Sequence, residues 1–110
     1  MSLSEVFEML NGITGFKNKV AYRAFPVNEA PALPFICYLD TYTSNFFADN
    51  KVYTIIQELD IELYSQIKDI TSEALIEAEF NAHDLTWQKS EEYILDEDMY
   101  VVVYTITVNQ

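Results

Sequence analysis

A strict alternation of apolar and polar residues runs through the middle of the chain, from residue 57 to residue 65. Leu59, Ile61 and Leu63 fall on one side of this stretch. The residues on the other side are acidic or carry a polar tip: Glu58, Asp60, Glu62 and Tyr64. A period of two residues is that of a β-strand with one buried face. The longer segment 51–68 has strand candidates on both sides, so we expect it to form the centre of a sheet.

Four other segments have the composition of β-strands: 16–25, 35–42, 85–91 and 99–108. The last of them, MYVVVYTITV, is apolar on both faces at its start, which favours a central or doubly covered position. In the segment before it, Leu85, Trp87 and Lys89 share one side, and Trp87 is expected to cover the edge of the core. The acidic stretch 91–98 is expected to connect these two strands.

Two segments between the strands are expected to be loops. The segment 26–34 holds every proline of the chain: Pro26, Pro31 and Pro34. Because proline lacks the amide donor that a sheet ladder needs, this segment is the best candidate for an exposed, extended arm. The segment 43–51 places Phe46 and Phe47 among turn-forming residues. Their rings either tuck under the loop as a small cluster or anchor a neighbouring subunit.

A short helix is predicted at 4–10, where Val6, Phe7, Met9 and Leu10 offer an apolar side. Ser2 or Ser4 is a suitable N-cap, and the Asn11-Gly12 pair is expected to end the helix. A helix of this length is not stable alone, so it must dock onto the rest of the protein.

A second helix is predicted at 70–82, with Asp69 or Thr71 as its N-cap. Its exposed face is expected to be acidic and to carry Glu73, Glu77 and Glu79. Its buried stripe is expected to consist of small and apolar residues: Ala74, Leu75, Ala78 and Ala82. The order of helix, three strands, helix and two strands predicts an α+β fold. We expect a mostly antiparallel sheet of about four to five strands, with one or two helices packed on one face.

The composition fits one globular domain spanning 1–110, since half of the 110 residues are hydrophobic and 22% are charged. The single cysteine, Cys37, lies in the apolar run PFICYL, where a buried structural thiol is the expected role. The single histidine, His83, has no partner at metal-ligand spacing. The sequence therefore predicts no metal site and no cofactor.

The chain is strongly acidic, with 18 Asp and Glu against 6 Lys and Arg and a net charge of −12. Such a surface is repelled by nucleic-acid phosphates and by anionic membranes, so we expect neither membrane binding nor direct sequence-specific nucleic-acid binding. Three of the basic residues are close together in the sequence: Lys17, Lys19 and Arg23. The chain has no apolar run long enough to span a membrane and no signal-peptide pattern, and we expect it to be made and used in a reducing, cytosolic setting.

Candidates for catalysis are weak. Glu58, Asp60 and Glu62 share one face of the predicted central strand, but the alternation places them on its polar side, where we expect them to be solvated and not paired in a buried cleft. The run Asp96-Glu97-Asp98 lacks the glycine and the ligand spacing of a calcium loop. With two glycines, one cysteine and one histidine, the chain holds no phosphate loop and no catalytic dyad or triad. We therefore predict that it is not an enzyme.

Three segments together resemble a family of small tail proteins of long-tailed phages and prophages of Gram-positive bacteria. They are LPFICYLDTYTSNFFADNKVY at 33–53, IELYSQIKD at 61–69 and EEYILDEDMYVVVYTI at 91–106, with an acidic helix between the last two. The resemblance therefore reaches across about two-thirds of the chain. One departure is Ile70, where the family pattern has proline.

The resemblance implies a tail terminator, tail completion or head–tail joining protein. Members of this family are small α+β subunits that form rings, commonly hexameric, at the top of the tail tube. The implied partners are other copies of the chain, the tail tube protein and the head connector proteins. The implied location is the virion tail, after assembly in the cytoplasm of the bacterial host.

A ring subunit needs two different surfaces that fit each other. The residues that we expect to supply them are Phe46, Phe47, Pro31, Pro34, Lys17, Lys19 and Arg23. Three other interpretations remain open at this point. One is a different position in the head–tail connection, another is an acidic adaptor or inhibitor of a basic protein, and the last is an enzyme that uses the carboxylates of the central strand.

Overall fold

The computed structural model describes residues 1–48 and 51–109, except for the side chains of residues 42–48 and 51–55. Within these residues the chain forms two α-helices, five strands and one short 3-10 helix. In chain order they are α1 (Leu3–Asn11), β1 (Val20–Tyr22), β2 (Phe35–Ala48), β3 (Lys51–Ser65), α2 (Ile70–Ala82), β4 (Trp87–Ile94), η1 (Leu95–Glu97) and β5 (Met99–Asn109).

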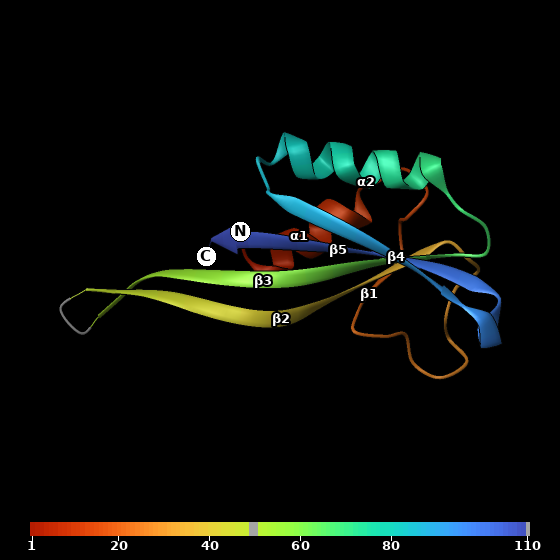
Figure 1. Ribbon diagram of the computed structural model, residues 1–110, viewed down its shortest axis with the longest axis horizontal. Helices are drawn as coiled ribbons and strands as arrows, with labels where there is room; N and C mark the ends of the chain where they lie inside the picture. The colour runs from red at the N-terminus through yellow and green to blue at the C-terminus, as the bar shows by residue number, and fades with distance from the viewer. Residues whose placement is uncertain (49–50, 110) are drawn as a thin grey trace.

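The strands form one sheet in the order β1-β2-β3-β5-β4 (Figure 1). The short strand β1 pairs parallel to β2, whereas all other neighbours are antiparallel. The prediction that the alternating stretch forms the centre of the sheet is confirmed, because β3 lies between β2 and β5. The α+β fold with a mostly antiparallel sheet is confirmed as well.

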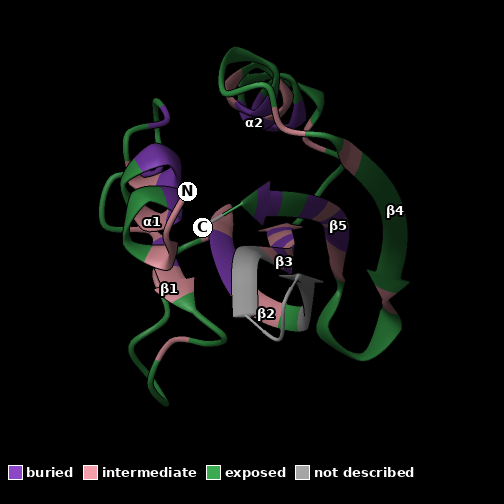
Figure 2. Ribbon diagram, turned by 90° about the vertical axis from the view of Figure 1, so that its left-hand side faces the viewer, coloured by how far each residue is buried: buried purple, intermediate pink, exposed green. Residues whose placement is uncertain are grey.

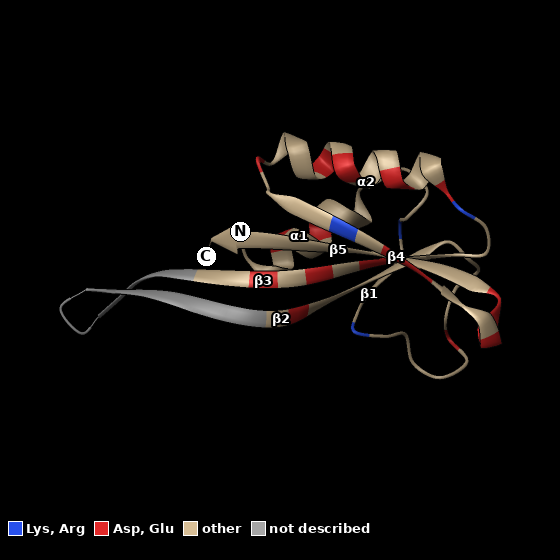
Figure 3. Ribbon diagram, viewed as in Figure 1, with Lys and Arg blue, Asp and Glu red and all other residues tan. Residues whose placement is uncertain are grey.

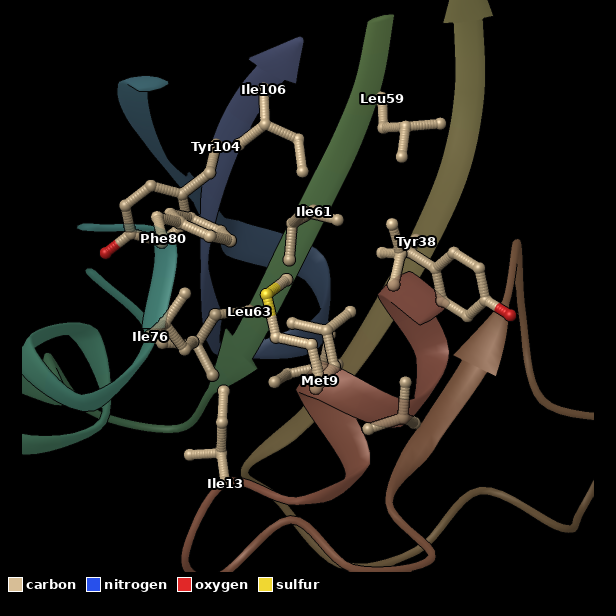
Figure 4. Packing of buried hydrophobic residues seen from close by; sticks show 14 of the residues in the cluster. Met9, Ile13, Tyr38, Leu59, Ile61, Leu63, Ile76, Phe80, Tyr104 and Ile106 are labelled. Carbon is tan, nitrogen blue, oxygen red and sulfur yellow. The ribbon is translucent and has the colours of Figure 1, made fainter. Parts of the chain in front are cut away.

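Both helices pack against the same face of the sheet, which we call the inner face (Figure 2). The register places Leu59, Ile61 and Leu63 of β3 beside Ile106, Tyr104 and Val102 of β5 on this face. Figure 4 shows these side chains meeting Met9 from α1 and Ile76 and Phe80 from α2. On the opposite face, which we call the outer face, the described residues place no helix (Figure 2).

Helix α1 begins with a capping box. The backbone amide of Glu5 donates to Ser2 Oγ at 3.2 Å, and the amide of Ser2 donates to Glu5 Oε1 at 3.0 Å. Ser2 is therefore the N-cap of the two candidates, and Gly12 ends the helix as predicted. Val6 and Leu10 are fully buried, so docking onto the sheet stabilises a helix that is too short to form alone.

Helix α2 has the predicted bounds, and Asp69 is its N-cap, since its Oδ1 accepts from the amide of Ser72 at 3.0 Å. The prediction of its buried stripe was wrong. The buried residues are Ser72, Glu73, Ile76 and Phe80, whereas the predicted ones lie toward solvent. The physical reason is that an acidic side chain with ion-pair partners can be buried, which frees the small residues to face outward. Glu73 was predicted on the exposed acidic face, and it is buried for the same reason.

The first strand is shorter than the predicted 16–25. The amide of Lys19 donates to the carbonyl of Phe16 at 2.9 Å, which makes the start of this segment a turn. Arg23 has a φ of 67°, in the left-handed region, which ends the extended run. Phe16 nevertheless contributes to the core, with 1% of its surface exposed.

The prediction of a loop over 43–51 was wrong for most of its length, because β2 continues to Ala48 and β3 begins at Lys51; residues 49–50 lie outside the described residues. The two strands stay paired over this length and extend beyond the helices as a long hairpin (Figure 1). Short polar residues favour turns only weakly. Here the backbone hydrogen bonds to the neighbouring strand outweigh that preference. The predicted connection over 91–98 was also too long. The strand β4 runs to Ile94, and the short 3-10 helix η1 follows it directly.

Candidate functional site

Three basic side chains gather around β1, at one edge of the sheet. Lys17 and Arg23 are exposed and Lys19 is half-buried. The Arg23 guanidinium lies 5.5 Å from the centre of the Tyr22 ring. Among the described residues, none of the three lies within ion-pair distance of a carboxylate. We call Lys17, Lys19 and Arg23 the basic corner.

The backbone holds the basic corner in a defined position. The amide of Asn18 donates to Asn11 Oδ1 at 2.9 Å, which ties this turn to the end of α1. The amide of Ile36 donates to the carbonyl of Lys19, and the amide of Arg23 donates to the carbonyl of Tyr38, both at 2.9 Å. The backbone that carries the three basic side chains is therefore held to α1 and β2 by hydrogen bonds.

The proline segment 26–34 follows the basic corner and forms neither helix nor strand, as predicted. Phe25 and Phe35 close its base, with ring centres 5.2 Å apart. Pro31 and Pro34 are partly exposed, and Val27 is 88% exposed. The segment is thus a loop beside the basic corner, and its tip reaches away from the core (Figure 1).

The side chains of Phe46 and Phe47 lie outside the described residues, so their expected role as interface anchors stays a prediction. Their backbone belongs to β2, in the projecting hairpin. Figure 1 places this hairpin and the loop 26–34 at opposite ends of the long axis of the molecule. The structure therefore brings the basic corner and the two prolines together but separates them from the hairpin.

The outer face carries a row of carboxylates along β3 (Figure 3). Glu58, Asp60 and Glu62 are half-buried there, and no cation of the described residues lies within ion-pair distance. Thr105 Oγ1 donates to Asp60 Oδ1 at 2.9 Å, and the Tyr64 hydroxyl donates to Glu62 Oε1 at 3.1 Å. The prediction that the acids share the polar face of the strand is confirmed, although neighbouring side chains partly cover them.

Burial is the main cause that raises the pKa of Glu62 above its ordinary value. The Tyr64 hydroxyl donates a hydrogen bond that lowers this pKa, and the neighbouring charge of Asp60 raises it. The ionised form of Glu62 is therefore disfavoured in the folded protein.

An open hollow of about 210 Å³ lies on the outer face, next to this row. Its walls carry one carboxylate and several hydroxyl or amide groups, and the lining residues are Glu58, Thr86, Trp87, Gln88, Thr105 and Thr107. The indole of Trp87 is turned to the inner face, where its Nε1 donates to Asn81 Oδ1 at 3.0 Å. A second hollow of about 120 Å³ adjoins it and shares Gln88 and Thr105. An ammonium or guanidinium group matches this lining better than an anion or a purely apolar group does.

A different set of charges joins α2 to the edge strand β4. Lys89 Nζ lies 3.1 Å from Glu73 Oε1 and 2.7 Å from Glu77 Oε2. Lys68 Nζ lies 2.8 Å from Glu73 Oε2 and also pairs with Glu91. The Tyr104 hydroxyl donates to Glu77 Oε2 at 2.7 Å. We call these six residues the ion-pair cluster.

The ion-pair cluster is a structural feature. Burial alone would raise the pKa of Glu77, but hydrogen bonds from Lys89 and Tyr104 lower it overall, so this carboxyl is held ionised. Hydrogen bonds to the glutamates likewise raise the pKa of Lys68 and Lys89. Groups held in one charge state near neutral pH are poor general acids or bases.

We did not predict the ion-pair cluster from the sequence, although the spacing of residues on α2 indicates it. Glu73, Ile76, Glu77 and Phe80 have the i, i+3, i+4, i+7 spacing of one helix face, which marks the glutamates as facing the core with the apolar residues. Lys89 alternates in phase with Trp87, which packs against the core, and therefore supplies the matching cation on the strand.

Cys37 is buried, as expected, and burial together with the charge of Glu62 raises the pKa of its thiol to about 11. In the part of the chain that the structure describes, no group of three or more His, Cys, Asp or Glu residues is arranged to hold a metal ion. No helix in the described ranges is long and apolar enough to cross a membrane.

A scan against known protein families finds no match for this chain, and a search of curated proteins finds none at a significant level.

Proposed function

We propose that this protein is a structural subunit of a phage tail, a tail terminator or head–tail joining protein that forms a ring on the tail tube. The observation that carries the proposal is the separation of unpaired charges within one sheet. The basic corner lies at the β1 edge, whereas the unpaired acids lie on the outer face of β3. Two different, complementary surfaces make a head-to-tail contact, and such a contact forms a ring when its rotation closes.

The body of the subunit suits this role because it is held together as one unit. A single core spans both helices and the strands β1, β2, β3 and β5. The ion-pair cluster adds a second connection, between α2 and the edge strand β4. A ring needs subunits that keep a fixed angle between their two contact surfaces, and a continuous sheet under two docked helices supplies that rigidity.

The net charge supports the same proposal. A tail ring surrounds the passage through which DNA leaves the head. A chain with a net charge of −12 repels phosphates, so DNA would move past it without binding. The proposed partners are further copies of this chain, the tail tube protein on one side of the ring and head connector proteins on the other.

The function is tested by inactivating the gene in the phage or prophage that encodes this chain and imaging the particles by electron microscopy. The proposal predicts tails of uncontrolled length or heads that lack tails, and plasmid-borne wild-type protein should restore normal particles. Normal infectious virions from the inactivated phage would rule the proposal out.

A second candidate function is an acidic adaptor or inhibitor of a basic protein, and the unpaired acids of the outer face favour it. The two candidates differ in what the isolated protein does. Light scattering on a sizing column gives the absolute mass over a range of concentration and salt. A ring of defined mass supports the tail protein, whereas a monomer that binds basic proteins in a salt-dependent manner supports the adaptor.

A further inference from the structure

We propose that the outer face of one copy receives the basic corner of a second copy, with a lysine side chain seated in the hollow between β3, β4 and β5. This inference rests on the proposed function, because it names the contact through which neighbouring subunits of the ring would join. The observations that lead to it are the two unpaired charge sets, their positions in the sheet and the lining of the hollow.

The receiving surface is chemically suited to a cation. Glu58 lines the hollow and Asp60 follows two residues later on the same face of β3. Thr105 and Thr107 add hydroxyl oxygens that can accept from an ammonium group, and Gln88 adds a side-chain amide oxygen. Because these acids are half-buried and have no cation among the described residues, an incoming positive charge would be attracted more strongly than at an open surface.

The inserting surface has matching chemistry. Lys17 and Arg23 are exposed. The turn that carries Lys17 is tied to Asn11 at the end of α1, and the amide of Arg23, after β1, donates to the carbonyl of Tyr38 in β2. Within the described part of the chain, the other two lysines with described side chains, Lys68 and Lys89, are already held by glutamates. Among the lysine and arginine side chains that the structure describes, the basic corner is therefore the set that remains for a contact between copies.

The contact cannot form within one chain, because the two surfaces belong to different parts of the sheet. The basic corner flanks β1 at one edge, and the hollow lies over β5 and the opposite edge strand β4.

A strand-to-strand contact through the β4 edge is a less suitable alternative. Lys89 and Glu91 point from this edge strand toward the helices, and inward-pointing charges on an edge strand oppose pairing with another sheet.

The experiment uses two full-length variants that reverse charge on opposite sides of the proposed contact. One is Lys17→Glu with Arg23→Glu, and the other is Glu58→Lys with Asp60→Lys. Each variant alone places like charges against each other, so its self-association should fall at least about tenfold. An equimolar mixture restores opposite charges at every contact and should recover the wild-type mass by light scattering.

Two controls separate the contact from net charge and from misfolding. Glu8→Lys with Asp96→Lys makes the same charge change at exposed acids away from the hollow, and it should leave self-association unchanged. Glu58→Gln with Asp60→Asn removes the charges with little change of shape, so it tests the contact even if the lysine variant fails to fold. Thermal unfolding checks that each variant is native.

Several outcomes would overturn the inference without deciding the function. Wild-type rings that persist in both charge-reversed variants would place the subunit contact elsewhere and leave the tail protein proposal standing. A wild-type chain that stays monomeric at low salt and high concentration, with a mixture that also stays monomeric, would show that the contact does not form. Salt-dependent binding of a lysine-rich peptide to that monomer, lost in Glu58→Gln with Asp60→Asn, would assign the outer face to a basic partner instead.

Discussion

Lys89 on the edge strand β4 reaches Glu77 on α2, with 2.7 Å between Nζ and Oε2. The same ammonium group lies 3.1 Å from Oε1 of Glu73, whose side chain is only 4% exposed. One lysine thus joins the edge strand β4 to the helix above it, beside the contacts that Lys68 and Tyr104 make to the same glutamates. Figure 4 shows the apolar neighbours of this region, Ile76, Phe80 and Tyr104.

Replacing Lys89 by Met should lower the free energy of unfolding by about 1–2 kcal/mol. Removing one partner of a buried pair costs more than this, but Lys89 is itself partly exposed, so solvent moderates the loss. Urea unfolding measures the change. Lys17→Met is the matched control, because Lys17 is exposed and unpaired with any described carboxylate, and its effect should stay within about 0.5 kcal/mol. Equal effects of the two substitutions would contradict a stabilising role for the cluster.

The contribution of Glu77 to stability should disappear in acid. Its pKa is lowered in the folded protein, so the folded state favours the ionised carboxyl more than the unfolded state does. That stability is present above the ordinary value of 4.5 and is lost as the pH falls through the lower folded pKa. Urea unfolding of wild type and Glu77→Gln from pH 3 to pH 7 should show a difference at pH 7 that shrinks toward pH 3. A constant difference would mean that the charge of Glu77 is not involved.

Glu62 should respond to pH in the opposite direction. Burial raises its pKa in the folded protein, so this residue favours the folded state below the ordinary value of 4.5, and that advantage is lost as the pH rises through the folded pKa. Glu62→Gln should therefore be more stable than wild type at pH 7, by up to about 1 kcal/mol, and the gain should vanish in acid. A variant that is less stable than wild type at pH 7 would show that the Tyr64 hydrogen bond outweighs burial.

Cys37 should be inert toward thiol reagents while the protein is folded. Burial and the charge of Glu62 raise the pKa of its thiol to about 11, and the thiolate is the reactive form. At pH 8 the folded protein should react more than about a hundredfold more slowly than the protein in urea, where the thiol has its ordinary pKa of about 8.5. The absorbance of the coloured product that a chromogenic thiol reagent releases measures the reaction rate of the folded protein and of the protein in urea. Fast reaction of the folded protein would mean that the strand β2 opens near Cys37.

The hairpin of β2 and β3 illustrates how local sequence and tertiary structure compete. Residues 43–48 contain short polar residues that form turns in isolation, and we predicted a loop there. In the folded protein the pairing runs from Thr43 opposite Gln57 to Ala48 opposite Lys51, with one register shift between Phe46 and Phe47, so the two strands supply hydrogen-bond partners to each other. Local propensity is a weak preference of a fraction of a kcal/mol for each residue, and a ladder partner overrides it.

The position of the buried stripe on α2 shows the same limit. The bounds of this helix followed from its cap at Asp69 and its helical composition, both of which act within a few residues. The face that it buries depended on Lys68 and Lys89, which neutralise Glu73 across the gap to the sheet. The spacing of Ile76 and Phe80 marks the buried face within the helix itself, but the two cations that make a buried glutamate possible there come from outside the helix.

The sequence by itself determined the α+β class, the central place of the alternating strand and the ends of both helices. These features depend on periodicity, caps and breakers, which are local and act before the chain packs. The tertiary structure alone decided the length of the hairpin, the burial of Glu73 and the separation of the basic corner from the acids of the outer face. These features depend on residues far apart in the chain, because charge pairing and strand pairing are set by which surfaces the packed sheet brings together.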